Sequence, residues 1–546
     1  MDELSLKVNQ KVYKLKWGNP RTGFKVKSMA KRGIKGITTM VAVGLAIVTL
    51  VVGLVVGMVV YPVVYPPPTI EEYEATIADL EADIADLGDT IDGLEATIDE
   101  YEVTIDALNA IIIGYEPTLA RLEAAITELK DHLQLLMQEA TEEAAAVAAV
   151  RLLTGAAPNW QALTGEIKIG AILTMTGDLA TFGENEECAA LFAIEEVNEL
   201  LADVGAGWTM KLEVEDTGCL PDVCLEKVES LNARGIKLLI GPLSSSELAN
   251  IMTYCNTEKI LTISQSSTAP ALGAVDFIFR YCPNDLWQGR AIARLMWEEG
   301  TRYVVPTWRG EAWGDGLEEQ GEIRFEELGG TFLEGVRYTV PRTEFSVEAA
   351  TLNDLVTSAV ETYGADQVAV WAISFEEIAA YMTEARAYPN LASVKWYGSD
   401  GTVVVPGLID PADPDLSAFA VTTEFINPIF SPLPATWKYD KVRNRVLDTY
   451  GRETDSYSYN IYDMVWAYFY SLLVVEEYDA EAIRAVLPDV VKLLHGATGW
   501  TEFDDNGDRA PTDYDLWVVS EVVAGVEYEW ERVGKWVLAT DTLEWL

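Results

Sequence analysis

The chain has 546 residues, of which 49% are hydrophobic, so it is long enough for two or three domains with sizeable cores. Its formal net charge is −48, which excludes a nucleic-acid-binding protein, because such proteins need a basic surface. Two interpretations of this acidity stay open: an adaptation to high salt or an extracellular setting, or a surface that is simply kept soluble.

The N-terminal segment predicts a membrane anchor. Residues 1–36 carry about ten Lys or Arg against Asp2 and Glu3. Residues 37–65, ITTMVAVGLAIVTLVVGLVVGMVVYPVVY, contain no charge and are long enough to cross a bilayer as a helix. No small-residue cleavage site or lipidation cysteine follows, so we expect an uncleaved signal anchor. The basic flank places residues 1–36 in the cytoplasm and the rest outside the cell.

Residues 69–150 predict a coiled-coil stalk. Isoleucine recurs every seven residues at Ile70, Ile77, Ile84, Ile91, Ile98, Ile105 and Ile112, and Leu or Tyr follows each one after three residues. This pattern is typical of a parallel two-stranded coiled coil and therefore predicts a homodimer. Gly114 and Pro117 interrupt the pattern, so a monomeric helical hairpin folded there stays open as the alternative. Residues 151–165 are expected to be a linker.

The five cysteines lie between Cys188 and Cys282. No pair has CxxC spacing and the chain has two histidines, so we expect neither a zinc site nor a cofactor. Cys219 and Cys224 flank a proline-containing loop and are a possible disulfide if this region lies outside the cell.

From residue 166 onward, short β-rich runs alternate with amphipathic stretches, in two successive sets. The order strand–helix–strand with strands buried on both faces predicts parallel, doubly wound sheets, hence two α/β lobes with a cleft between them. We expect lobe 1 to include residues 166–285 and 424–510, and lobe 2 to include 286–423 and 511–540.

Polar and aromatic residues follow the predicted strands, where ligands bind in open α/β sheets. Ser245, Ser266 and Thr268 offer hydroxyls near a helix N-terminus, which suit a carboxylate. Asp400 offers a negative charge suited to an ammonium group, and apolar walls are expected from Phe182, Trp313 and Phe375. Simpler roles stay open: the serines could cap a helix, Asp400 could belong to a turn and Trp313 to a core. Together the set fits a free amino acid.

The stretches GPLSSSE, ILTISQSSTAPAL, EAWGDGLEEQ and YGSDG resemble successive blocks of the branched-chain amino-acid type of substrate-binding protein. The resemblance covers residues 166 to about 540. It implies the type I periplasmic-binding (Venus flytrap) fold, with no enzymatic activity, and delivery of a solute to an ABC permease. The ligand-binding positions that it implies are Phe182, Ser245, Ser266, Thr268, Trp313, Ser374, Phe375, Asp400 and Tyr457.

Three classes of function remain to be compared. The first is a membrane-anchored receptor that binds a branched-chain or related amino acid, or otherwise an amide, urea or an aromatic carboxylate, for an ABC importer. The second is the ligand-sensing ectodomain of a surface receptor, although a 36-residue cytoplasmic end is too short for a signalling module. The third is a nucleotide-using enzyme, but neither GxGxxG nor GxxxxGK[ST] follows the first strand.

Overall fold

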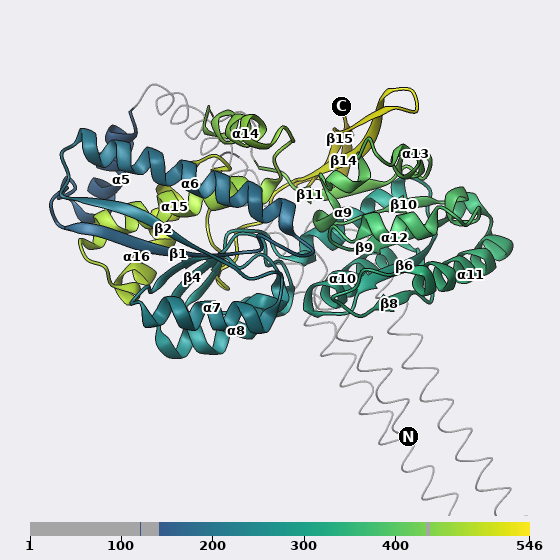
Figure 1. Cartoon of the computed structure of the whole chain (residues 1–546), viewed down its shortest axis with the longest axis horizontal. Coiled ribbons are helices and arrows are strands. Elements are labelled where there is room, and N and C mark those ends of the chain that lie inside the picture. Colours follow the sequence, from purple (N-terminus) through teal and green to yellow (C-terminus); the bar gives the residue numbers. More distant parts are fainter. Residues whose placement is uncertain (1–120, 122–140, 433–436) are drawn as a thin grey trace, which may run out of the picture. The chain divides into compact units, whose positions relative to one another are not determined.

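The computed structural model describes residue 121 and residues 141–432 and 437–546. The two described ranges belong to one compact unit, which spans Thr127–Leu546. Two large sheets with helices packed against them, and a two-stranded sheet, make up this part of the chain (Figure 1).

The first sheet is fully parallel, with strand order β2–β1–β3–β4–β5. Its strands are β1 (Gly165–Leu173), β2 (Trp208–Asp216), β3 (Leu238–Ile240), β4 (Leu261–Ser264) and β5 (Ile278–Arg280). Helices α6 (Ala180–Asp203), α7 (Pro221–Ala233) and α8 (Ser245–Glu258) alternate with them. Every residue of β3 and β4 is buried, as expected for strands covered on both faces.

The second sheet is mixed, with order β16–β15–β14–β11–β10–β9–β6–β7, and β8 pairs with β6. Its parallel strands are β6 (Tyr303–Arg309), β7 (Thr331–Phe332), β8 (Val336–Tyr338), β9 (Val368–Ile373), β10 (Lys395–Tyr397) and β11 (Ile426–Phe430). β14 (Tyr514–Val523) pairs antiparallel with β11, and β15 (Glu527–Val537) and β16 (Thr542–Trp545) extend the sheet, each antiparallel to the strand before it. Its helices are α9 (Asp285–Glu298), α10 (Ala312–Leu328), α11 (Ser346–Tyr363), α12 (Ile378–Ala385) and α13 (Pro414–Thr422).

Three helices near the C-terminus complete lobe 1, which is the first sheet with its helices. They are α14 (Trp437–Tyr450), α15 (Ser456–Val475) and α16 (Ala480–Leu493), followed by the short strands β12 (His495–Gly496) and β13 (Gly499–Trp500). Helix α15 is buried from Ser456 to Leu473 because it packs against both α6 and α16. Lobe 2 is the second sheet with its helices. The two predicted α/β lobes are therefore confirmed.

One expected lobe boundary needs correction. The sequence placed residues from 424 onward in lobe 1, but β11 pairs with β10 and β14 inside the second sheet. The chain therefore leaves lobe 2 after Phe430 instead. Strand β11 is short and contains Pro428, so it carries only a weak strand signal in the sequence.

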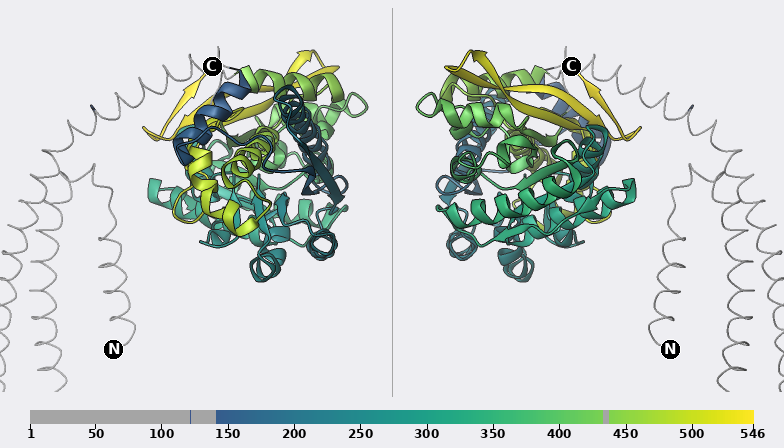
Figure 2. Two further views of the ribbon diagram at one scale, coloured as in Figure 1. Left: turned by 90° about the vertical axis from the view of Figure 1, so that its left-hand side faces the viewer. Right: turned by 90° about the vertical axis from the view of Figure 1, so that its right-hand side faces the viewer.

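Helix α5 (Glu142–Thr154) joins the expected stalk to lobe 1. It packs against α15 and α16, burying Ala146, Ala149 and Val150 (Figure 2). The expected linker is held against lobe 1 as well, since the carbonyl of Trp160 accepts the indole N–H of Trp208 at 3.2 Å. Residues 142–154 are thus part of the folded domain, not of a free-standing helix.

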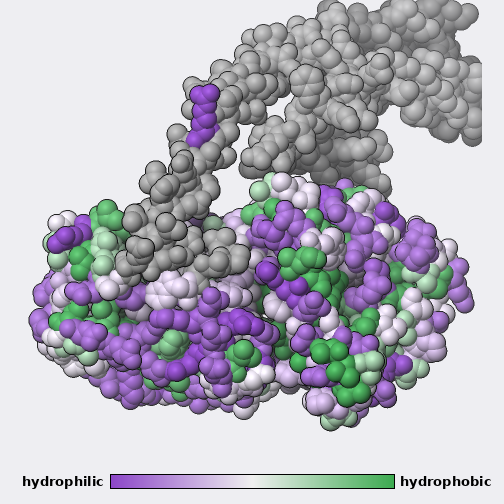
Figure 3. Space-filling view, turned by 90° about the horizontal axis from the view of Figure 1, so that it is seen from above, coloured by the Kyte–Doolittle hydropathy of each residue, from purple (hydrophilic) through white to green (hydrophobic). Residues whose placement is uncertain are grey.

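The predicted membrane span 37–65 and the heptads from Ile70 onward lie outside the described residues. Within residues 141–432 and 437–546, no helix combines the length and apolarity that crossing a bilayer requires. On the face seen in Figure 3, hydrophilic residues predominate, with small hydrophobic patches between them.

The possible Cys219–Cys224 disulfide is wrong for this structure. All five cysteines, each of them in the described ranges, are free thiols. Cys224 lies on α7 and is fully buried in a core cluster that also contains Val228 and Cys255, whereas Cys219 lies in the loop before this helix with a φ of 60°. Their spacing in the sequence suits a bridge, but the packing of α7 turns the Cys224 thiol into the core.

Candidate ligand-binding cleft

A cavity with about 310 Å³ of empty space lies between the two lobes. The residues that line it are Leu179, Phe182, Leu243, Ser244, Ser245, Ser266, Trp313, Phe375, Asp400, Gly401 and Tyr457. They come from loops that follow β1, β3, β4, β6, β9 and β10 and from the start of α15, so the carboxyl ends of both sheets face one cavity.

The N-terminus of α8 forms one side of the cavity. Ser244 is its N-cap: its Oγ accepts the Glu247 N–H at 3.3 Å, and the Glu247 carboxylate accepts the Ser244 N–H at 3.2 Å, which completes a capping box. The capping role considered for these serines is thus confirmed for Ser244. Ser245, the first residue of the helix, lines the cavity, where the unpaired N–H groups of a first turn attract an anion.

The hydroxyls of residues 264–268 hold two ligand-facing loops together. Ser264 Oγ donates to the Pro242 carbonyl at 2.8 Å, and Ser266 Oγ donates to the Leu243 carbonyl at 2.8 Å. Ser267 Oγ donates to the Ser244 carbonyl at 3.1 Å. These hydrogen bonds tie the carbonyls of residues 242–244, at the start of α8, to the chain that follows β4. Of the three side chains, Ser266 also lines the cavity.

A buried ion pair holds residues 267–269, which follow β4, in place. The Arg280 guanidinium donates to both carboxylate oxygens of Asp508, at 2.6 Å each, and both side chains are 2% exposed. Its third nitrogen donates to the carbonyls of Ser267 at 2.9 Å and Ala269 at 2.6 Å. Arg280 therefore joins the chain after β4 to the turn at residues 503–509.

Four aromatic rings enclose the cavity. The Trp313 and Phe375 rings stack with centroids 4.5 Å apart, and the Phe182 and Tyr457 rings are tilted at 6.3 Å. The guanidinium of Arg309 lies over the Phe375 ring, 4.1 Å from its centroid. Such walls accept an apolar or aromatic side chain and exclude water.

Asp400 gives the cavity its charge. One carboxylate oxygen accepts the hydroxyl of Tyr457, and the other accepts the Gly401 N–H at 3.0 Å. Burial raises the pKa of this carboxyl above its usual range, against the hydrogen bonds from Tyr457 and Gln288, which lower it. Within residues 141–432 and 437–546, no Lys, Arg or His forms an ion pair with Asp400. A buried carboxylate without a cation provides a site for a positively charged group of a ligand.

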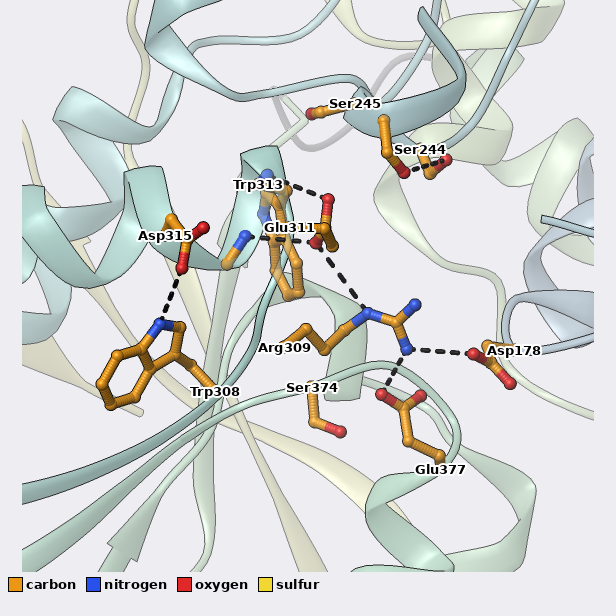
Figure 4. Close-up of polar contacts among 12 residues, drawn as sticks. Asp178, Ser244, Ser245, Trp308, Arg309, Glu311, Trp313, Asp315, Ser374 and Glu377 are labelled. Atoms are coloured by element: carbon orange, nitrogen blue, oxygen red, sulfur yellow. Dashed lines mark hydrogen bonds and ion pairs between the residues drawn. The ribbon is translucent and has the colours of Figure 1, made fainter. Parts of the chain in front are cut away.

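Polar contacts cross between the lobes beside the cavity (Figure 4). Arg309 of lobe 2 forms ion pairs with Glu377, with Glu311 at 3.9 Å and, across the cleft, with Asp178 of lobe 1 at 3.0 Å. Next to it, Glu376 of lobe 2 accepts both the N–H of Thr181, at 2.7 Å, and its hydroxyl, at 3.0 Å. Burial raises the pKa of Glu376 to about 7.

Seven of the nine residues expected to bind ligand line the cavity, and two do not. Thr268 is buried behind it, and Ser374 Oγ accepts the Tyr338 hydroxyl at 2.9 Å. The sequence did not single out Leu179, Leu243 or Gly401, although each adjoins a loop that it did. The contact between Arg309 and Asp178 carries no local sequence signal, because the two residues are 131 positions apart.

Residues 166–522 match the periplasmic binding protein family. The chain belongs to this family. It is 29% identical over 398 residues to an uncharacterized protein of Methanocaldococcus jannaschii, covering 69% of this chain and 91% of that one. It is also 24% identical over 196 residues to a leucine-, isoleucine-, valine-, threonine- and alanine-binding protein of Pseudomonas aeruginosa, which covers 35% of this chain and 52% of that one. The chain thus spans about half the length of that relative.

Solved structures show the same fold. A leucine-binding protein of Thermotoga maritima superposes with a TM-score of 0.55 at 21% identity, over 67% of this chain and 97% of that one. A solute-binding protein of an ABC transporter from Rhodopseudomonas palustris, in complex with 3,4-dihydroxybenzoic acid, gives a TM-score of 0.54 at 15% identity, over 68% and 97% of the two chains. The chain therefore has the type I periplasmic-binding fold.

Proposed function

We propose that this protein binds a free amino acid, branched-chain or related, between its lobes. The observation that carries the proposal is the arrangement of opposite charges around one cavity. Asp400 lies on it without a cationic partner in the described residues, and the first turn of α8 with Ser245 also lies on it. An ammonium group and a carboxylate on one small molecule satisfy both, and the aromatic walls accept its side chain.

The contacts between the lobes support a binding cycle by closure. Two contacts cross from lobe 1 to lobe 2: the ion pair of Asp178 with Arg309, and the hydrogen bond of Thr181 with Glu376. Separation of the lobes would open the cavity to solvent, and ligand would favour the arrangement in which these contacts form. Amides, urea and aromatic carboxylates are the alternative ligands. The four aromatic rings and the relative that holds 3,4-dihydroxybenzoic acid favour an aromatic carboxylate among them.

In the cell, we propose a receptor that delivers its solute to the permease of an ABC importer. Residues 37–65 would anchor it in the cell membrane as a single span, with residues 1–36 in the cytoplasm and the binding domain outside. The heptads would pair two copies through a coiled coil, or fold back as a hairpin in a monomer. A ligand-sensing ectodomain remains the alternative for the same domain.

A thermal-shift series on the protein and its Asp400→Asn variant tests the ligand class. We expect L-leucine, L-isoleucine, L-valine or another free amino acid to raise the melting temperature of the wild-type protein, because binding stabilises the folded state. At a fixed amino-acid concentration, Asp400→Asn should strongly reduce this shift, whereas Asp354→Asn, on the exposed face of α11, should keep it. A shift with benzoates alone, retained in Asp400→Asn, would refute the amino-acid proposal in favour of aromatic carboxylates.

A further inference from the structure

A second buried carboxyl group, that of Asp285, is linked to Asp400 through a single glutamine side chain. Asp285 is the first residue of α9, at the point where the chain crosses from lobe 1 to lobe 2. It is completely buried, like the Asp400 carboxyl, whose charge acts on it. Asp285 was not among the residues expected to bind ligand, and it does not line the cavity.

One glutamine connects the two carboxyl-bearing residues. The Gln288 side chain donates to Asp285 Oδ1 at 3.0 Å, and its carbonyl oxygen accepts the N–H of Asp400 at 2.9 Å. Asp285 also reaches the other end of the cavity, because its N–H donates to the carbonyl of Thr268 at 2.9 Å. Asp285 thus lies between the stretch that faces the proposed ligand carboxylate and the residue that faces the proposed ammonium.

The surroundings of the pair supply little positive charge. The titratable and charged groups that face it from the neighbouring elements are Arg280, Cys282, Tyr457, Asp508 and Tyr514. Arg280 is the single cation of this set, and its charge is already matched by Asp508. Burial raises the pKa of both carboxyls, and the charge of Asp400 raises that of Asp285 further. Two buried carboxyls in such a setting are not both ionised without an added positive charge.

We propose that Asp285 and Asp400 share one proton in the ligand-free protein, and that the ammonium group of the ligand displaces this proton to solvent. This inference rests on the proposed function. The charges balance: two carboxyls with one proton carry −1, and two carboxylates with one ammonium group also carry −1. Asp285 acts as a positioning residue that sets the proton content of the pair, while Asp400 touches the ligand.

The expected consequence is that binding of an amino acid releases about one proton. Affinity then falls about tenfold for each pH unit below the range in which the pair loses its proton. Binding of a ligand without an amine, such as benzoate, releases none. This difference separates proton displacement from a purely structural role of Asp285, because a structural role would not couple binding to proton release.

Two measurements on the full-length protein test the proposal, and the first needs no ligand. Infrared difference spectra of ligand-free wild-type protein against Asp285→Asn and against Asp400→Asn should each show loss of one protonated-carboxyl band at neutral pH. The control Asp354→Asn, on the surface, should leave this band in place. Because both positions are tested, failure of one variant to fold leaves the other. A band that persists in both variants would overturn the proton sharing.

The second measurement is calorimetric titration with L-leucine in buffers of different ionisation enthalpy. We expect about one more proton released by wild type than by Asp285→Asn. Glu376 contributes equally to both proteins, so the difference reports on the pair. Equal release by the two proteins would overturn the displacement. If neither leucine nor any other free amino acid binds while the infrared band behaves as expected, the proposed function fails and ligand-driven displacement fails with it, whereas the shared proton stands.

Discussion

Because the ion pair of Arg280 and Asp508 is buried, we expect a large loss of folding stability when the Asp508 carboxylate is replaced by an amide. Asp508→Asn keeps the shape of the side chain but removes its charge. The guanidinium then stays buried, at 2% exposure, with uncharged partners only: the amide oxygen of the new side chain and the carbonyls of Ser267 and Ala269. Removing one partner of such a pair costs about 3–5 kcal/mol, because the other charge is left uncompensated in the interior.

A matched pair on the surface provides the control. Lys259 and Glu481 approach to 2.7 Å, but their side chains are 56% and 57% exposed. Glu481→Gln should therefore cost about 0–1 kcal/mol, since water and salt screen an exposed pair. Both variants change a carboxylate to an amide in lobe 1, so they differ mainly in burial.

Urea unfolding followed by tryptophan fluorescence measures the two losses. We expect a clear drop of the midpoint for Asp508→Asn and almost none for Glu481→Gln. The double variant Arg280→Met/Asp508→Asn should lose less than the sum of the two single variants, because the uncompensated charge is gone. A loss for Asp508→Asn no larger than that for Glu481→Gln would refute the view that this pair fixes the stretch after β4.

Three further predictions concern binding, closure and assembly. Asp400→Asn should weaken L-leucine binding by about 1.5–3 kcal/mol, or roughly 10- to 100-fold in calorimetry, since an ammonium loses its charged partner; unchanged affinity would place the amine elsewhere. Burial raises the pKa of Glu376 to about 7 in the contact between the lobes. Protonated Glu376 therefore stabilises this contact fully at pH values below the usual pKa of a glutamate, and this stabilisation is lost as the pH rises through 7. Small-angle scattering should show lobes opening over that range in wild type and not in Glu376→Gln. Sedimentation should find the full-length chain dimeric and residues 141–546 monomeric; monomers in both cases would contradict the predicted coiled coil.

The sequence predicted the cavity better than it predicted individual side chains. Parallel strands bring their carboxyl ends to one edge, so the polar loops after β3, β4 and β10 converge whatever their detailed conformation. Which hydroxyl faces the cavity depends on the turn of each loop. Ser266 faces it, while Ser267 and Thr268 point into the protein, where Ser267 completes the hydrogen bonding of Ser244.

Contacts between distant segments were beyond reach of the sequence pattern. Arg309 follows a predicted strand and has no distinguishing pattern around it in the sequence, yet it forms an ion pair with Asp178 across the lobes. Asp285 likewise fits an ordinary first turn of a helix, and its proximity to Asp400 follows from the crossing of the chain between lobes. The Cys219–Cys224 bridge failed for the same reason, because spacing does not fix the direction in which a helix turns its side chains.

The packing of α5 on lobe 1 has a mechanical consequence. A chain that enters the domain through a helix buried against α15 and α16 passes a restraint on that helix to lobe 1. Lobe 2 is connected to lobe 1 by three passages of the chain, at Asp285, after Phe430 and before Tyr514. In a membrane-anchored protein, lobe 1 would then stay fixed relative to the anchor. Closure on a solute would be observed as a rotation of lobe 2.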